Sequence, residues 1–149
     1  NKKLKYDFEN AILIHGGGWK KMENKKISNF LFKKKLFEKL KIKNVINYYG
    51  LVEQTGSIFI ECEKCESFIS SIFSEVLIRD KNFNIQKPGE RGLVQLFSIL
   101  PTSYPGHSII TEDIGEILPK NKIKCNLDTT HFLIHGRSKH SEVRGCSDV

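Results

Sequence analysis

The sequence predicts an α/β fold, in which the end of a parallel α/β layer precedes a small antiparallel β-sheet or distorted barrel. An apolar run at 11–14 and a β-branched run at 44–47 enclose a segment with helical periodicity. Strand, helix and strand in this order form a βαβ unit, whose two strands pair in parallel. From residue 75 onward, short strand-like runs alternate with turn signals, which is typical of an antiparallel sheet.

The helix and the strands can be placed individually. Ser28 is a typical N-cap, and the spacing behind it predicts a helix over about 29–41, with apolar positions at Phe30, Leu31, Phe37 and Leu40. Further strands are predicted at 57–62, at 75–80, at 93–97, at 111–118 with a break at Gly115, and at 131–135. Residues 63–74 are predicted to be irregular and to mark the join between an α/β part, 1–62, and a β-rich part, 63–149.

The composition of the 149 residues is that of a folded protein, with 39% hydrophobic and 28% charged residues. No apolar run approaches the roughly 20 residues that a transmembrane helix needs. The first segment resembles neither a signal peptide nor a transit peptide, so we expect a cytoplasmic protein. Because the chain begins at Asn1 without an initiator Met, we also expect it to be a fragment of a longer one.

The net charge of +7 is concentrated near the N-terminus. Residues 1–43 hold 13 Lys against 4 acidic residues, whereas residues 44–149 hold 11 Lys and Arg against 13 acidic residues. The basic segment lacks the Arg and the interleaved aromatic residues of base-reading surfaces. We therefore predict a solvated helix face and no nucleic-acid partner. A basic module that binds nucleic acid or an anionic membrane is the alternative from another functional class.

Polar side chains follow the predicted strand at 44–47. The stretch 48–56, YYGLVEQTG, supplies a carboxylate, an amide and a hydroxyl directly after the strand. Ligand sites in α/β sheets lie outside the carboxyl ends of such strands. Similar places occur at Gly16-Gly17-Gly18, at 111–113 and at 136–137. We expect these four places to converge on one nucleotide; for the glycines, a flexible turn is the alternative.

The chain contains four cysteines, which we expect to be reduced in the cytoplasm. Cys62 and Cys65 have the spacing of half a zinc site, but no second close pair follows. Cys125 and Cys146 are 21 residues apart. A four-cysteine zinc site therefore stays open as an alternative, beside the simpler interpretation that Cys62 and Cys125 are small buried hydrophobic residues.

Four short motifs follow one another along the chain. They are Tyr49-Gly50-Leu51-Val52-Glu53, Gly89-Glu90-Arg91-Gly92, Thr111-Glu112-Asp113, and Gly136-Arg137 with Val143-Arg144 and Gly145. In this order they resemble the Y-G-x-T-E, G-E-x-G, T-G-D and G-R-x-x-x-x-I-K-x-x-G motifs of the adenylate-forming superfamily. That superfamily includes acyl- and aryl-CoA synthetases, peptide-synthetase adenylation domains and firefly luciferase. The resemblance implies that the chain is part of a larger adenylate-forming N-terminal domain.

A narrower resemblance covers nearly the whole chain. The segments 15–21, 49–57, 100–107 and 144–146 are similar to those of the acyl-protein synthetases of bacterial bioluminescence operons. Those enzymes activate a fatty acid with ATP and then hold the acyl group on a cysteine. The resemblance therefore implies ATP and Mg²⁺ as cofactors and a fatty or aryl carboxylic acid as substrate. An acyl-reductase or an acyl-carrier protein is the implied partner.

The resemblance also implies roles for individual residues. It places Glu53 on Mg²⁺, a metal for which one or two protein carboxylates suffice. Asp113 accepts hydrogen bonds from the ribose hydroxyls, and Arg137 binds ribose or phosphate oxygens. The residues implied along the adenine are Tyr49, Gly50, Gly16, Gly17 and Gly18.

Cys146 is the candidate acyl carrier, because the bioluminescence relatives use a cysteine close to the C-terminus. The cations of Arg144, Arg137 and Lys139 would favour its thiolate. A structural cysteine is the alternative for this residue. Lys139 falls where the superfamily has its hinge residue.

Some features depart from the superfamily pattern. Val52 stands where a phosphate-binding Thr is usual, and the Ser/Thr/Gly-rich phosphate loop is absent from these residues. We therefore expect the 149 residues alone to be inactive. An aryl- or acyl-CoA ligase of the phenylacetate type is the alternative enzyme.

Overall fold

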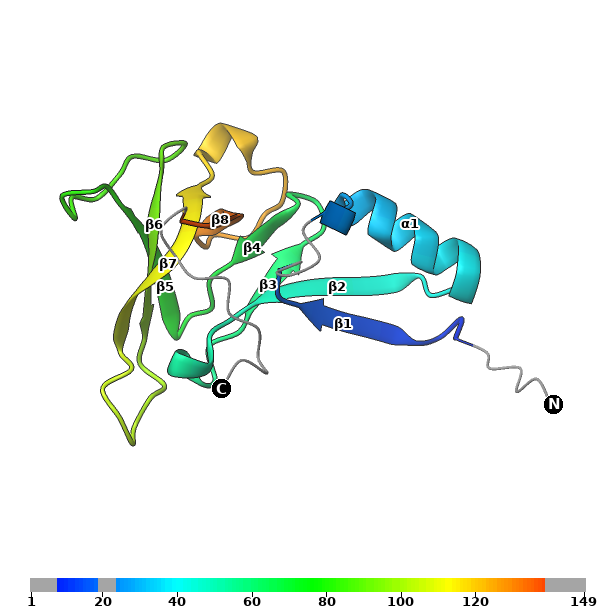
Figure 1. Ribbon diagram of the computed structural model, residues 1–149, viewed down its shortest axis with the longest axis horizontal. Helices are drawn as coiled ribbons and strands as arrows, with labels where there is room; N and C mark the ends of the chain where they lie inside the picture. Colours follow the sequence, from blue (N-terminus) through cyan, green and yellow to red (C-terminus); the bar gives the residue numbers. More distant parts are fainter. Residues whose placement is uncertain (1–7, 19–23, 139–149) are drawn as a thin grey trace. The chain divides into compact units, whose positions relative to one another are not determined.

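The computed structural model describes residues 8–18 and 24–138 (Figure 1). Among these, the residues up to Asn47 belong to one compact unit and the residues from Tyr48 onward belong to a second.

The first unit is a βαβ unit, as predicted. It contains β1 (Ile12–Gly16), α1 (Asn29–Leu40) and the start of β2 (Asn44–Tyr49). β1 and β2 are neighbours in the sheet and run in the same direction (Figure 1). The ring of His15 on β1 meets the ring of Phe32 on α1 edge-on, with centroids 4.9 Å apart.

The ends of α1 have well-defined caps. The Leu31 N–H donates to Ser28 Oγ at 3.2 Å, as the N-cap prediction requires. Lys41 ends the helix in the left-handed conformation, with φ 61°, and its N–H donates to the Phe37 carbonyl. No residue of α1 is buried, and Phe30 is 74% exposed. None of the described helices is both long and apolar enough to cross a membrane.

The second unit is an open antiparallel sheet. Its strands are β3 (Phe59–Cys62), β4 (Ser67–Ile69), β5 (Ser74–Arg79), β6 (Arg91–Ser98), β7 (Ser108–Ile117) and β8 (His131–Arg137). The strand order is β2-β3-β4-β8-β7-β6-β5, and each of these neighbouring pairs is antiparallel. The order is linear, so the sheet predicted from the sequence forms and does not close into a barrel.

The prediction that residues 63–74 are irregular was wrong, because β4 lies within them. Three residues are too few to show an alternating pattern in the sequence. Their strand conformation comes from pairing on both sides, with Ser67 opposite Cys62 on β3 and Phe68 opposite Phe132 on β8. Tertiary pairing thus overrides a weak local signal.

The predicted break at Gly115 is a shift of register within a continuous strand. β7 runs through this residue, but its pairing with β8 shifts between Ile114 and Gly115. A Cβ atom at Gly115 would collide with the Leu133 carbonyl and the Val94 side chain. The glycine therefore allows β7 and β8 to approach closely at this point.

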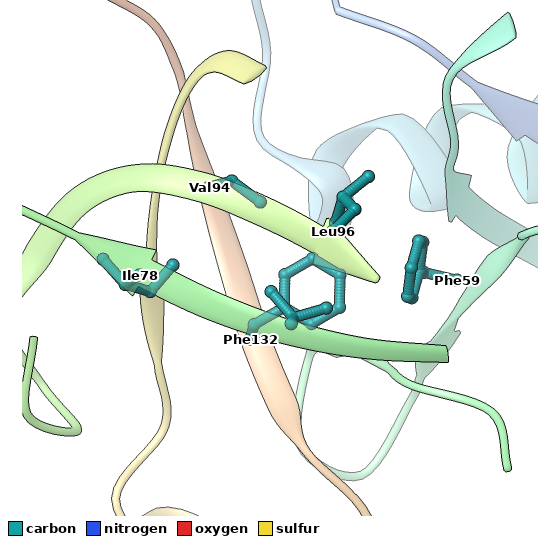
Figure 2. Packing of buried hydrophobic residues seen from close by; sticks show 6 residues of the cluster. Phe59, Ile78, Val94, Leu96 and Phe132 are labelled. Atoms are coloured by element: carbon teal, nitrogen blue, oxygen red, sulfur yellow. The ribbon is translucent and has the colours of Figure 1, made fainter. Parts of the chain in front are cut away.

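The hydrophobic core of the second unit joins four strands. Its members are Phe59 from β3, Val76 and Ile78 from β5, Val94 and Leu96 from β6, and Phe132 from β8 (Figure 2). The rings of Phe59 and Phe132 meet edge-to-face, with centroids 5.3 Å apart. Tyr49 and Phe68 pack against this cluster. Phe132 therefore connects the β3 side of the sheet with β5 and β6.

Phe132→Ala should lower the free energy of unfolding by about 3–5 kcal/mol, because it leaves a cavity in a fully buried cluster. Phe30→Ala on α1 is the matched control and should change it by less than about 0.5 kcal/mol, because that ring is exposed. Urea unfolding of the full-length chain measures both values. Equal losses for the two variants would contradict this assignment of the core.

Candidate functional site

Asp113 lies on β7 and is held by Tyr49, 64 residues earlier in the chain. The Tyr49 hydroxyl donates to Asp113 Oδ2 at 2.7 Å. The backbone N–H of Asp113 donates to Thr111 Oγ1 at 3.0 Å. The Asp113 side chain remains 17% exposed. An ionised carboxylate has about four acceptor positions, so Asp113 can still accept hydrogen bonds from a ligand.

The Tyr49 ring is part of the core. It contacts the rings of Phe59, Phe68 and Phe132, with centroids 5.9–6.1 Å apart. Burial, and then the negative charge of Asp113, raise the pKa of Tyr49 far above its ordinary value. Tyr49 therefore stays protonated at physiological pH and acts as a hydrogen-bond donor.

Arg137 lies beside Asp113 because the two are register partners in the β7–β8 pair. The guanidinium forms an ion pair with Glu112, and its Nε atom lies 3.9 Å from Asp113 Oδ1. Gly136 precedes it with φ 121°, a conformation that favours glycine. The Arg137 side chain is 44% exposed, so a cation is presented to solvent directly beside the carboxylate of Asp113.

Glu53 lies in a short 3₁₀ turn, Val52–Gln54, which follows β2. A second loop holds this turn. The buried Gln54 side chain donates from Nε2 to the Gly106 carbonyl at 2.9 Å, and the Thr55 N–H donates to the Tyr104 hydroxyl at 2.9 Å. The loops at 52–57 and 100–107 are therefore fixed to one another.

The position of Glu53 suits a magnesium ligand. Its side chain is exposed, and no described residue forms an ion pair with it. Magnesium usually takes one or two protein carboxylates and completes its shell with water and substrate phosphates. A single accessible carboxylate therefore fits this metal.

The structure groups some predicted site residues and leaves others apart. Tyr49, Asp113 and Arg137 form one connected group, and Glu53 lies four residues beyond Tyr49 in the same unit. Gly16, Gly17 and Gly18 belong to the first unit, so their place in the same site stays a prediction. Cys146 and Lys139 lie outside the described residues, and their roles stay predictions too.

The Gly89–Gly92 motif has a structural explanation. Gly89 has φ 90°, and its N–H donates to the Ile117 carbonyl. The Glu90 carboxylate accepts from the Lys87 N–H at 2.9 Å. A Cβ atom at Gly92 would collide with the backbone of Arg79. The motif forms the turn that starts β6.

Sequence reasoning named Tyr49 as an adenine contact but missed the two contacts that hold this site in place. Tyr104 anchors one loop to the other, and the Tyr49 hydroxyl holds Asp113. The sequence held one signal of the Tyr104 contact, which is the glycine at position 106. A side chain at this position would collide with the Tyr104 ring. The Tyr49–Asp113 contact left no local signal, because it joins distant parts of the chain.

The sequence model of the acyl-protein synthetase, LuxE, family matches residues 2–149. The chain belongs to this family. Searching curated proteins gives no match.

Solved structures show that this LuxE-family chain has the fold of one part of adenylate-forming enzymes. Apo MatB from Rhodopseudomonas palustris aligns with a TM-score of 0.56 at 14% identity, over 86% of this chain and 26% of MatB. The anthranilate CoA ligase AuaEII, in complex with anthranoyl-AMP, aligns with a TM-score of 0.59 at 13% identity, over 89% of this chain and 27% of the ligase.

A luciferase-like enzyme from the nonluminescent Zophobas morio mealworm aligns with a TM-score of 0.58 at 18% identity, over 89% of this chain and 33% of the enzyme. The LuxE-family chain thus spans about a quarter to a third of the length of these structures.

Tyr49→Phe should lower the free energy of unfolding by about 1.5–3 kcal/mol near neutral pH, because it removes a hydrogen bond to a charged, partly buried carboxylate. Tyr48→Phe is the matched control on the same strand and should cost less than about 1 kcal/mol. Urea unfolding from pH 6 to pH 11 measures the difference.

The pH dependence provides a second readout. The pKa of Tyr49 is raised by folding, so the folded protein keeps this proton when the unfolded chain loses it near pH 10. The stability advantage of wild type over Tyr49→Phe should be constant below about pH 9 and decline above about pH 10. An advantage that grows with pH would contradict a protonated Tyr49 donor.

Proposed function

We propose that the chain is part of an enzyme that activates a fatty acid with ATP as an acyl-adenylate and then transfers the acyl group to a protein cysteine. The observation that carries this proposal is the pairing of Asp113 with Arg137, held by Tyr49, in a chain of the acyl-protein synthetase family. The fold shared with adenylate-forming enzymes supports the first step.

In the first step, a carboxylate oxygen of the fatty acid attacks the α-phosphorus of ATP. The bond from this phosphorus to the pyrophosphate oxygen breaks, which yields acyl-AMP and pyrophosphate. Two anions must approach one another, so catalysis depends on positioned positive charge. Arg137 would supply a fixed cation at the ribose or phosphate oxygens. Glu53 would hold Mg²⁺, which neutralises charge on the phosphate oxygens when it is bound.

Asp113 would bind the nucleotide through both ribose hydroxyls. Two neighbouring hydroxyl donors suit the two oxygens of one carboxylate. The Tyr49 hydroxyl fixes the orientation of this carboxylate before the nucleotide arrives. Because the Tyr49 ring packs in the core, we assign the adenine contact chiefly to Gly50 and to the glycines at 16–18, and Tyr49 to positioning Asp113.

In the second step, the Cys146 thiolate would attack the carbonyl carbon of the acyl-adenylate. The thiol proton has passed to solvent when the thiolate forms; the bond from the carbonyl carbon to the AMP oxygen then breaks, and AMP leaves. The product is an acyl thioester on the protein. An acyl-reductase or an acyl-carrier protein would then take the acyl group from this thioester.

Asp113→Asn should raise the KM for ATP about 10- to 100-fold, because one charged acceptor for the ribose hydroxyls is lost. Glu53→Gln should lower kcat more than it raises KM, because the metal ligand acts on the reacting phosphates. The measurement is fatty-acid-dependent ATP–pyrophosphate exchange by the complete enzyme of which these 149 residues are proposed to be a part. Glu38→Gln, an exposed carboxylate on α1, is the control and should be unchanged.

Exchange by the wild type that does not depend on a carboxylic acid would contradict the adenylation step. Unchanged kinetics in both Asp113→Asn and Glu53→Gln would contradict this placement of the site.

Cys146→Ser should retain ATP–pyrophosphate exchange but lose the labelled, thiol-sensitive acyl-protein adduct, because only the second step needs the thiol. The adduct is measured by denaturing gel electrophoresis after incubation with radiolabelled fatty acid and ATP. Glu38→Gln, the control of the exchange assay, should keep the adduct. An adduct that persists in Cys146→Ser, or an acyl group that appears on coenzyme A instead, would contradict transfer to this cysteine.

A further inference from the structure

A cluster of three thiols and one imidazole lies in the second unit and shares no residue with the group assigned to nucleotide binding. We call it the thiol–imidazole cluster, and its members are Cys62, Cys65, Cys125 and His131. Cys62 ends β3, Cys65 lies in the turn before β4, Cys125 lies in the segment before β8, and His131 begins β8. Three separate segments of the chain therefore meet at one point.

The spacing of the four side chains fits a tetrahedral metal ion. One sulfur or ring-nitrogen atom from each residue lies within 4.8 Å of those from the other three. Zinc binds thiolate sulfur at about 2.3 Å and imidazole nitrogen at about 2.0–2.1 Å, so a tetrahedral site needs sulfurs about 3.8 Å apart and sulfur and nitrogen about 3.6 Å apart. Cys125 Sγ and His131 Nε2 are 3.5 Å apart.

The three thiols are free, so the cluster is not explained by a disulfide. They are also only half-buried, which disfavours the interpretation of Cys62 and Cys125 as small buried hydrophobic residues. Soft thiolates combined with imidazole in a tetrahedral arrangement are typical of zinc. Three thiolates and one imidazole fill all four positions, which is the composition of a structural site rather than a catalytic one.

The surroundings of His131 orient it for metal binding. Its ring is buried, and Nδ1 lies 2.9 Å from the Ser67 hydroxyl, which is buried as well. A proton on Nδ1 donated to Ser67 leaves the Nε2 lone pair facing the thiols. Metal-bound histidines usually have such a partner on the second ring nitrogen.

A backbone hydrogen-bond donor faces the sulfur of Cys65. The backbone N–H of Lys124 donates to Cys65 Sγ at 3.3 Å. A backbone donor aimed at sulfur stabilises the negative charge that a metal-binding cysteine carries.

We propose that the thiol–imidazole cluster is a closed structural zinc site, with Cys62, Cys65, Cys125 and His131 as its four ligands. The ion would fasten the turn between β3 and β4 to the start of β8. Ser67 is a positioning residue that fixes the His131 ring. This site is independent of the proposed adenylation and would hold zinc whether or not the chain activates a fatty acid.

The first test is the zinc content of the purified full-length chain, measured by inductively coupled plasma mass spectrometry. We expect one zinc ion per chain, and its loss in Cys125→Ser and in His131→Asn. The matched controls are Cys146→Ser and His135→Asn, which change a cysteine and a histidine outside the cluster and should keep the ion. Zinc retained in both Cys125→Ser and His131→Asn would overturn the proposal.

A second test needs no ligand variant and so does not depend on variants that fold poorly. The wild-type chain is loaded with Co²⁺ in place of zinc, and its absorption spectrum should show a tetrahedral site with thiolate-to-cobalt charge transfer. Ser67→Ala should keep this spectrum and weaken zinc binding about 10- to 100-fold. A folded wild-type chain that binds neither zinc nor cobalt, or that shows an octahedral cobalt spectrum, would overturn the proposal.

Discussion

The hydrogen bond from Tyr49 to Asp113 connects the hydrophobic core with the candidate site. The ring of Tyr49 packs against Phe132 and its hydroxyl holds the carboxylate, so one side chain belongs to both. The bond is partly buried, and a low local dielectric strengthens a hydrogen bond to a charged group. Packing of the core therefore fixes the orientation of Asp113, and a cavity near Phe132 would loosen the carboxylate as well as the sheet.

The charged groups of the site are preorganised by strand pairing and by loop contacts. Asp113 and Arg137 face one another because β7 and β8 pair in register, and Glu53 lies in a turn that Gln54 joins to the Gly106 backbone. None of these positions depends on a long flexible loop. Groups held in this way lose little freedom when a ligand binds, which is how a rigid site lowers the cost of bringing reactants together.

Local patterns in the sequence predicted the elements whose signals are local. The N-cap at Ser28 and the apolar spacing behind it placed α1, and short strand-like runs between turn signals placed β5, β6 and β8. Short β4 was missed because its conformation comes from its two neighbours. The motifs indicated Asp113 and Arg137 through their family resemblance. The Tyr49–Asp113 bond could not be predicted, because a pattern along the chain does not show contacts between residues 64 positions apart.

The proposed zinc site accounts for a weak point in the sheet. In the strand order, β4 separates two parts of the sheet. One part consists of β2, which carries Tyr49, and β3. The other part consists of β8 and β7, and β7 carries Asp113. A three-residue strand supplies few hydrogen bonds to hold two halves of a sheet in register. Cys62 lies opposite the start of β4 and His131 lies opposite its end, so an ion bound to both spans this strand. The metal would then hold together the two parts of the sheet that carry Tyr49 and Asp113, on either side of its shortest strand.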